Sequence, residues 1–354
     1  MINLAALTSG RDIPSSRYRV RQHIAPLRQA GILVKEFIPA VDKYRPPPWG
    51  SITASGKPYS FSRISWEVAK LSLRLPGLIG SWRSDITWLE RKMLSGSISL
   101  EPLVKRPYVF DVDDAIWLVM PPLGRRAAEK IAKRAELVLA GNAYIADWFS
   151  VYTSAIRIIP TAVDTDRFRV HKQKPLDTGG RCFIIGWIGT ASNYPGLYAI
   201  EKVLKRFLDD HKCKFLIVAD KPPQFKLIPD SFLKFIKWSK DIELEALMYM
   251  DVGIMPLPDN EWSRGKCSYK MLQYMAMEIP VVVSPVGMNR EVLSMGDVGF
   301  PARTSDDWYN ALDELYEKPF LRRRLGKNGR DLVGKKFSRS KITPVLASIF
   351  KEVI

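Results

Sequence analysis

Cysteine and histidine are both scarce in this chain, and long apolar runs are missing. The 354 residues include three cysteines, Cys182, Cys213 and Cys267, and three histidines. The cysteines lie far apart without the paired spacing of a zinc site, so we expect reduced thiols and no disulfide framework. The longest uncharged run, Cys182–Ile200, is interrupted by Gly, Ser, Asn and Pro, which excludes a membrane span there.

Acidic residues are also few relative to basic ones. Lys and Arg number 54 against 37 Asp and Glu, and the resulting formal net charge of +17 favours anionic partners. Nucleic acid is disfavoured, because no binding module is recognisable and the aromatics do not alternate with cations as a stacking platform requires. Phosphate-bearing substrates and anionic lipid therefore remain as the partners to consider.

The region from Ser62 to Trp88 combines cations with Trp and Leu. A helix over Ile64–Leu75 has two neighbouring faces, an apolar one with Ile64, Val68, Leu71 and Leu75 and a basic one with Arg63, Lys70 and Arg74. Such a helix suits an anionic membrane surface, although an ordinary domain helix with a solvated face fits equally well. Because the first ten residues lack the basic leader of a signal peptide, we expect a cytoplasmic protein. Whether the protein also associates peripherally with the inner face of the plasma membrane stays open.

Short apolar strands alternate with helical segments along the chain, a pattern typical of parallel sheets with helical crossovers. We expect strands near 3–7, 33–37, 85–88, 108–112, 137–140 and 156–159, and then near 183–188, 214–218, 235–238, 252–255, 281–283 and 299–300. A polar stretch over 170–181 contains Pro and Gly-Gly and is the expected linker. The predicted class is α/β, with two domains of ordinary size.

The segment from Asp251 to Val292 carries the strongest functional signal. A buried strand leads into a polar loop that holds Glu261, Arg264 and Lys266, and a helix opened by Ser268 follows. Backbone donors at a helix start, beside fixed cations, form a site for a diphosphate. Gly265 would let the backbone approach that ligand closely. A solvated basic loop over a core helix is the alternative interpretation.

The helix after Ser268 is expected to have two faces. Its apolar face would pack on the core and consists of Met271, Leu272, Met275 and Ala276. Its other face would point toward the loop and consists of Lys270, Gln273 and Tyr274.

Three carboxylates, Asp111, Asp113 and Asp114, end a strand at the edge where parallel sheets place their ligands. Acids in this position can coordinate a divalent metal, orient acceptor hydroxyls or act as a base. Alternatively, Asp113 or Asp114 caps the following helix through backbone N–H groups.

Motifs in both halves resemble those of GT-B glycosyltransferases, in particular the retaining group that includes the bacterial family 4 (group 1) enzymes. In family order they are SSRYRV at Ser15–Val20, YVFDVDDAIW at Tyr108–Trp117, IPTAVD at Ile159–Asp164 with Phe168, GWIGT at Gly186–Thr190, and the Asp251–Val292 segment. The resemblance implies two Rossmann-like domains with parallel sheets facing a central cleft. Residues 1–170 would form the acceptor domain, 171–336 the nucleotide-sugar donor domain, and 337–354 a helix that crosses back to the first domain.

Two departures from the family pattern concern the donor site. The family motif E-x7-E becomes E-x11-Q, from Glu261 to Gln273, and Gln still offers donor and acceptor groups to a ribose. The loop Gly189–Pro195 lacks the Arg and Lys that clamp the diphosphate in related enzymes. In our interpretation, Arg264, Lys266 and Lys270 supply the missing charge.

The resemblance assigns roles to individual positions. The implied catalytic residues are Asp113, Glu261, Arg264 and Lys266. The implied donor-binding residues are Gly189, Thr190, Arg264, Lys266, Lys270, Gln273 and Asn289. On the acceptor side, the resemblance implies Ser16, Arg17, Arg19 and Asp114. No metal and no tightly bound cofactor are implied, since GT-B enzymes usually work without a bound metal.

The implied function is retaining transfer of a sugar from a nucleotide diphosphate sugar to a glycan or lipid-linked acceptor, in cell-surface polysaccharide or lipopolysaccharide biosynthesis. An anionic membrane surface is the further expected partner. Two alternatives stay open: a GT-B sugar-nucleotide epimerase or hydrolase, and a catalytically silent glycan-binding protein, which the E-x11-Q departure permits.

Overall fold

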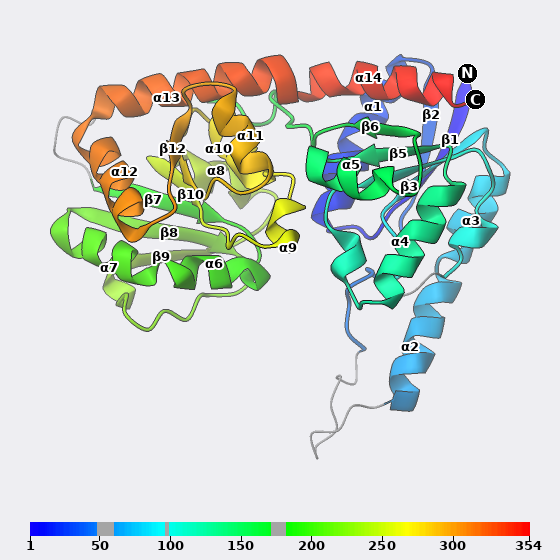
Figure 1. The fold of residues 1–354 in the computed structure, drawn as a ribbon, viewed down its shortest axis with the longest axis horizontal. Coiled ribbons are helices and arrows are strands. Elements are labelled where there is room, and N and C mark those ends of the chain that lie inside the picture. The colour runs from blue at the N-terminus through cyan, green and yellow to red at the C-terminus, as the bar shows by residue number, and fades with distance from the viewer. Residues whose placement is uncertain (48–59, 96–98, 171–181) are drawn as a thin grey trace. The chain divides into compact units, whose positions relative to one another are not determined.

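The chain forms two compact units. The computed structural model describes residues 1–47, 60–95, 99–170 and 182–354, with side chains described from Ser65 onward in the second range. Unit 1 consists of Met1–Ala162 and Arg339–Ile354, and unit 2 consists of Val163–Ser338. Each unit contains one six-stranded sheet with helices packed around it (Figure 1). Apart from Val170, the expected linker lies outside the described residues.

The sheet of unit 1 is parallel throughout, in the order β2-β1-β3-β4-β5-β6. Its strands are β1 (Ile2–Leu7), β2 (Ile32–Phe37), β3 (Ile86–Glu90), β4 (Tyr108–Val112), β5 (Leu137–Ala140) and β6 (Ile156–Ile158). Every residue of β3 and β4 is buried, as expected for central strands of a sheet covered on both faces. Because the strand order reverses between β1 and β3, their carboxyl ends border the switch point where such sheets bind ligands.

The helices of unit 1 include one from the far end of the chain. They are α1 (Ile24–Gln29), α2 (Ser60–Ser72), α3 (Leu75–Trp82), α4 (Leu123–Arg134), α5 (Ala143–Ser150) and α14 (Arg339–Glu352), with single turns at Ser16–Val20, Arg21–His23, Glu101–Leu103 and Ile116–Leu118. Phe350 of α14 packs on Trp88 with ring centroids 4.9 Å apart. Ile2 and Val353 pack on the same core, and Figure 1 shows the two chain ends side by side.

Unit 2 repeats this plan with the strand order β12-β11-β10-β7-β8-β9, again all parallel. Its strands are β7 (Phe183–Ile188), β8 (Cys213–Ala219), β9 (Leu233–Lys237), β10 (Val252–Met255), β11 (Val281–Val283) and β12 (Gly299–Pro301). The order reverses between β7 and β10, so the loops after these two strands border the switch point. The expected α/β class, with two Rossmann-like units, is confirmed.

The helices of unit 2 surround a core rich in aromatic side chains. They are α6 (Tyr194–Ala199), α7 (Glu201–Asp210), α8 (Ile242–Met248), α9 (Glu261–Arg264), α10 (Tyr269–Ala276), α11 (Met288–Ser294), α12 (Ser305–Glu317) and α13 (Pro319–Leu332), with single turns at Ala191–Asn193, Asp230–Phe232 and Val333–Phe337. Phe183, Trp187, Phe207 and Trp308 belong to that core. Thr304 and Asp307 form a capping box that fixes the start of α12.

The helix expected over Ile64–Leu75 is wrong in its bounds and in its basic face. It is two helices, α2 and α3, because Pro76 fits only in the first turn of a new helix. Lys70 is buried and its Nζ donates to Lys43 O at 3.2 Å, while buried Arg74 donates to Thr8 O at 2.6 Å. These two cations therefore do not face solvent. The side chains of Arg63 and Ile64 lie outside the described part.

No helix among the described residues is both long and apolar enough to cross a membrane.

Candidate functional site

The loop after β7 holds a lysine against a glycine. A Cβ atom on Gly189 would lie 2.7 Å from both Cε and Nζ of Lys270, so only glycine leaves room for that side chain. Lys270 Nζ also lies 4.7 Å from the centre of the Trp187 ring, a cation–π contact that fixes the amine. The structure thus brings two of the expected donor-binding residues together at the switch point of unit 2. Thr190 is exposed on the same loop, where its hydroxyl lies 2.9 Å from Ser192 Oγ.

The polar loop after β10 presents its charged residues to solvent. Asn260 caps α9 by accepting a hydrogen bond from Ser263 N at 2.9 Å, and Glu261 follows as the first, exposed residue of the helix. Arg264 Nε donates to Asp259 Oδ1 at 2.8 Å, and about half of each side chain is exposed. Lys266 Nζ lies 5.5 Å from the Trp262 ring centre. Of the three expected cations, only Lys270 is placed against the first loop.

The glycine that this region requires is Gly287, at the start of α11. We expected Gly265 to permit a close backbone approach, yet its φ of −74° is an ordinary right-handed value. Gly287 instead has φ of +52°, and a Cβ there would lie 2.7 Å from Arg264 O. Gly287 therefore packs the beginning of α11 directly against the backbone of the α9 loop.

The polar face expected on α10 is largely wrong, because two of its three residues are buried. Gln273 Nε2 donates to Glu243 Oε1 at 3.2 Å, so its amide would have to leave Glu243 to reach a ribose. Tyr274 OH accepts a hydrogen bond from Ile188 N at 2.9 Å, which holds β7 in place just before Gly189. Of the three, only Lys270 reaches the loop.

Asn289 also differs from expectation, and Glu243 is the buried partner of Gln273. Asn289 is fully buried, and its Nδ2 donates to Ser284 O at 3.0 Å, so it holds the turn before α11 and is not open to a ligand. Glu243, which the sequence analysis missed, is buried and lies 2.8 Å from Arg167 NH2. Its only sequence signal is an acidic pair, Glu243 and Glu245, in the first turn of α8.

In unit 1, Glu90 organises the carboxyl ends of β1 and β3. Its Oε2 accepts hydrogen bonds from Ser9 N and from Ser16 Oγ, each at 2.8 Å. Ser16 is fully buried, so the acceptor contact expected of it is wrong, and it fixes the loop after β1 instead. Glu90 could not be identified from the sequence, because a single acid at the end of an apolar strand has no distinctive pattern.

Arg91, at a left-handed φ of +56°, binds two of the three expected strand-end carboxylates. Its Nε donates to Asp113 Oδ1 at 2.5 Å and its NH2 to Asp114 Oδ2 at 2.6 Å. Burial alone would raise the pKa of Asp113, but the charge and hydrogen bond of Arg91 outweigh it and the pKa is lowered. Neither Asp113 nor Asp114 is the N-cap residue of the next helix, because Ile116–Leu118 begins after Ala115 and α4 begins after Pro122.

Arg19 is a structural residue and not an acceptor contact. It is buried, and its NH2 donates to Asp111 Oδ1 at 2.6 Å while its NH1 donates to Ile159 O at 2.6 Å. Burial raises the pKa of Asp111 to about 6, despite the opposing charge of Arg19. Arg17, half-buried with its guanidinium 4.8 Å from the Tyr18 ring centre, remains accessible.

A pocket of about 260 Å³ opens beside Glu90. Its apolar lining comes from the ends of β1 and β2, the start of α3 and the loop after β3, and consists of Leu7, Phe37, Ile38, Pro39, Ala40, Leu73, Pro76 and Met93. Arg74 and Glu90 also line it, and both Arg74 Nε and Glu90 Oε1 are buried without a hydrogen-bond partner. Such atoms are costly unless a ligand or water satisfies them.

Comparison with known proteins shows which family and which solved structures this chain is similar to. Residues 182–318 match the family model described as "Glycosyl transferases group 1". Sucrose-phosphate synthase from Thermosynechococcus elongatus superposes with a TM-score of 0.70 and 14% identity over 99% of both chains. HepE from Anabaena, in complex with UDP-glucose, superposes with a TM-score of 0.69 and 15% identity over 99% of this chain and 100% of its own. An α-glucosyltransferase in complex with UDP-glucose and DNA containing an abasic site superposes with a TM-score of 0.69 and 12% identity over 99% of both chains. No match was found among curated proteins.

The fold and the family match together define the class of this protein. It has the GT-B fold that the sequence motifs predicted, and its residues 182–318 match the group 1 glycosyltransferase model. Its second unit carries the group 1 glycosyltransferase domain, and that domain includes β7 with the Gly189 loop, Lys270 and the start of α11.

Proposed function

We propose that this glycosyltransferase takes its sugar from a uridine diphosphate sugar and transfers it, with retained anomeric configuration, to a glycan or lipid-linked acceptor of cell-surface polysaccharide or lipopolysaccharide biosynthesis. The observation that carries the donor half is Lys270, held against Gly189 at the switch point of unit 2. The choice of uridine rests on HepE and the α-glucosyltransferase, whose structures contain UDP-glucose.

The chemistry is electrostatic. Lys270 stabilises the charge that develops on the leaving diphosphate, and its contact with Trp187 means that little reorganisation is needed when that charge forms. Arg264 is half-exposed, and its ion pair with Asp259 is of the weak solvent-screened kind, so it can exchange that partner for a phosphate oxygen. Lys266 adds a second point charge, and Glu261 binds the sugar hydroxyls.

The proton of the acceptor hydroxyl is proposed to pass to the leaving phosphate. Asp113 is a weak base because Arg91 lowers its pKa, so it stays ionised and orients hydroxyl groups. Retention follows when the leaving oxygen assists attack on the face from which it departs.

The acceptor is proposed to enter the pocket beside Glu90. One of its hydroxyls can donate to Glu90 Oε1 and accept from Arg74 Nε, which satisfies both buried atoms. The apolar walls suit the C–H face of a sugar ring or an alkyl chain. Half-buried Arg17 is the proposed contact for an anionic group on the same acceptor.

A membrane-bound acceptor requires a surface that reaches the membrane, and we propose that α3 supplies it. Leu75, Ile79 and Trp82 are exposed at helical spacing along α3, and Trp82 Nε1 donates to the carbonyl of exposed Leu103 at 3.0 Å. This apolar stripe replaces Lys70 and Arg74 as the proposed contact with an anionic lipid surface.

The donor assignment is tested with Lys270→Gln and calorimetry of UDP binding. Loss of a charge-assisted phosphate bond costs about 1.5–3 kcal/mol, so we expect affinity to fall roughly tenfold or more. Lys202→Gln, which removes the same charge from an exposed position on α7, is the matched control and should bind UDP normally. Equal affinity in the two variants would remove Lys270 from the site.

Assays with intact UDP-sugars separate the rival functions. A transferase consumes the donor faster when acceptor is added, whereas a hydrolase or epimerase consumes it at the same rate without one. A silent glycan-binding protein would bind the acceptor and leave the donor unchanged.

A further inference from the structure

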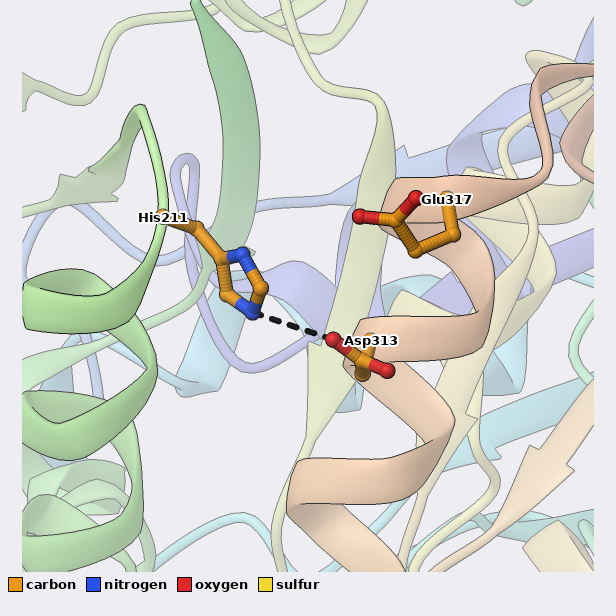
Figure 2. Close-up of side chains that lie close together, drawn as sticks. All are labelled: His211, Asp313 and Glu317. Carbon is orange, nitrogen blue, oxygen red and sulfur yellow. Dashed lines mark ion pairs between the residues drawn. The ribbon is translucent and has the colours of Figure 1, made fainter.

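Three side chains of unit 2 form a group with the composition of a metal site. His211 follows the end of α7, and Asp313 and Glu317 lie one turn apart on α12, a spacing that puts both carboxylates on one helix face. One ligand atom from each residue lies within 4.8 Å of the other two. Figure 2 shows the three side chains pointing toward one another, with His211 Nε2 3.1 Å from Asp313 Oδ1.

The contact between His211 and Asp313 is not a hydrogen bond. Although the two atoms are close, the direction of the contact is unsuitable, and Nε2 is buried without a hydrogen-bond partner. The imidazole is also held in place, because its ring centroid lies 4.3 Å from that of Phe207 and 4.4 Å from that of Tyr316. The imidazole is fixed, its nitrogen is unsatisfied, and two carboxylates lie beside it. These groups can donate electron pairs to a metal cation.

Neighbouring charged groups are already engaged and leave this group intact. Asp210 accepts a hydrogen bond from Tyr309 OH at 2.7 Å, and Arg206 stacks over the Tyr309 ring at 4.2 Å. Lys318 pairs with Glu314 at 3.0 Å. Within the described part of the chain, no residue bonds to the carboxylate of Glu317, so this exposed side chain has freedom to close on an ion.

We propose that His211, Asp313 and Glu317 bind a divalent transition-metal ion, with zinc as the preferred occupant. Zinc takes imidazole nitrogen and carboxylate oxygen at about 2.0–2.2 Å, which puts adjacent ligand atoms roughly 3–3.5 Å apart. The 3.1 Å separation of His211 Nε2 and Asp313 Oδ1 already fits that geometry. Magnesium and calcium are disfavoured because they prefer oxygen ligands alone. Water would complete the coordination.

The ion would be structural and separate from sugar transfer. His211 precedes β8, at the amino-terminal edge of the sheet, whereas Gly189 and the start of α9 lie beyond the carboxyl ends of β7 and β10. An ion at this edge joins the α7–β8 connection to α12. Because it binds the folded chain and not the unfolded one, it raises the melting temperature with zinc concentration.

The test uses the full chain freed of metal with EDTA, zinc chloride as the probe, and both calorimetry and thermal melting as readouts. We expect one zinc per chain and a rise in melting temperature. His211→Gln and Glu317→Gln should each bind zinc at least tenfold more weakly and lose the rise. Glu314→Gln, on the same helix but outside the group, should behave like the unmodified chain. Glu317→Gln keeps the test valid if the change at half-buried His211 disturbs folding.

Cobalt(II) substitution distinguishes this group from the cysteines. Binding by His211, Asp313 and Glu317 gives d–d bands without a sulfur-to-cobalt charge-transfer band. A charge-transfer band that persists in Glu317→Gln would assign the metal to thiols and overturn the proposal. Zinc affinity unchanged in both variants, or the absence of any melting shift in the unmodified chain, would overturn it as well.

Discussion

Buried charge at single residues, more than exposed charge, shapes unit 1. Glu90 binds two groups of the β1 loop through one oxygen and leaves the other, Oε1, without a hydrogen bond. Arg74 likewise uses its terminal nitrogens on Thr8 O and Ser9 O and leaves Nε unpaired. Leaving two opposite charges incompletely bonded beside a pocket is unfavourable in the empty protein, and a hydroxyl-bearing ligand removes that penalty.

Filling this pocket from its rim should block acceptor binding and nothing else. Ala40 is exposed and lines the pocket, so Ala40→Phe places a ring there and leaves the residues Glu90 and Arg74 unchanged. The probe is octyl glucoside below its critical micelle concentration, since it carries a sugar and an alkyl chain. By calorimetry, we expect at least a tenfold loss of affinity for octyl glucoside in Ala40→Phe, with UDP affinity unchanged. Ser150→Phe on α5 is the control, and equal octyl glucoside binding by the two variants would contradict the pocket assignment.

Residue types were easier to predict from the sequence than their exposure. Lys270 and Gly189, both expected at the donor site, do lie together, but the sequence also placed Ser16, Arg19 and Asn289 in contact with ligands although all three are buried. A polar residue at a strand end has the same local pattern whether it binds a substrate or holds its own loop. Only the packing of distant segments decides, as when Ile159 O, far along the chain, accepts from Arg19.

At the scale of elements, each switch point depends on close packing between loops that follow different strands. In unit 2, the loop after β7 meets α10 through Gly189 and Lys270, and α11 meets the α9 loop through Gly287 and Arg264. Replacing either glycine by a larger residue would have a different energetic cost. A Cβ on Gly189 would meet the flexible end of Lys270 and, at 2.6 Å, the ring of buried Trp187, whereas a Cβ on Gly287 would meet rigid backbone at a positive φ.

Gly189→Ala should therefore weaken donor binding and also cost some stability. Its Cβ would displace the Lys270 amine, so UDP affinity is expected to fall about as far as in Lys270→Gln, and its 2.6 Å approach to the buried Trp187 ring should lower the melting temperature. Combining the two substitutions should add little further loss. Gly296→Ala, whose Cβ would meet only Val298 at 3.9 Å, is the control. Additive losses in the double variant would show that the Gly189 loop acts independently of Lys270.

Elements with a strong periodic signal were predictable, and their interruptions were less so. The strands expected from the sequence are all present, because central parallel strands are continuous apolar runs such as β3 and β4. The break between α2 and α3 was missed although Pro76 signals it, since the apolar spacing continues from Val68 to Leu75 across the break. Hydrophobic periodicity thus indicated where helices lie but not where one ends and the next begins.

On the scale of the whole molecule, a net charge of +17 sets the long-range interactions. It draws the chain toward anionic phosphates and lipids, and this attraction is screened beyond about 8 Å at physiological ionic strength. Charge alone gives salt-sensitive binding without a fixed orientation. An apolar contact such as the stripe on α3 would add binding that salt does not remove and would orient the protein.

The full chain should therefore bind anionic vesicles by two separable contributions. In vesicle flotation with phosphatidylglycerol and phosphatidylcholine, we expect more binding to the anionic lipid, reduced but not abolished by salt. Ile79→Ser and Trp82→Ser each remove an exposed apolar side chain of α3, which contributes up to about 1.5–3 kcal/mol when buried, so vesicle binding should fall roughly tenfold. Val151→Ser, at a position 79% exposed on the same unit, is the control. If all three variants bind anionic vesicles alike, α3 is not the membrane contact, and binding that salt abolishes completely would reduce the interaction to charge alone.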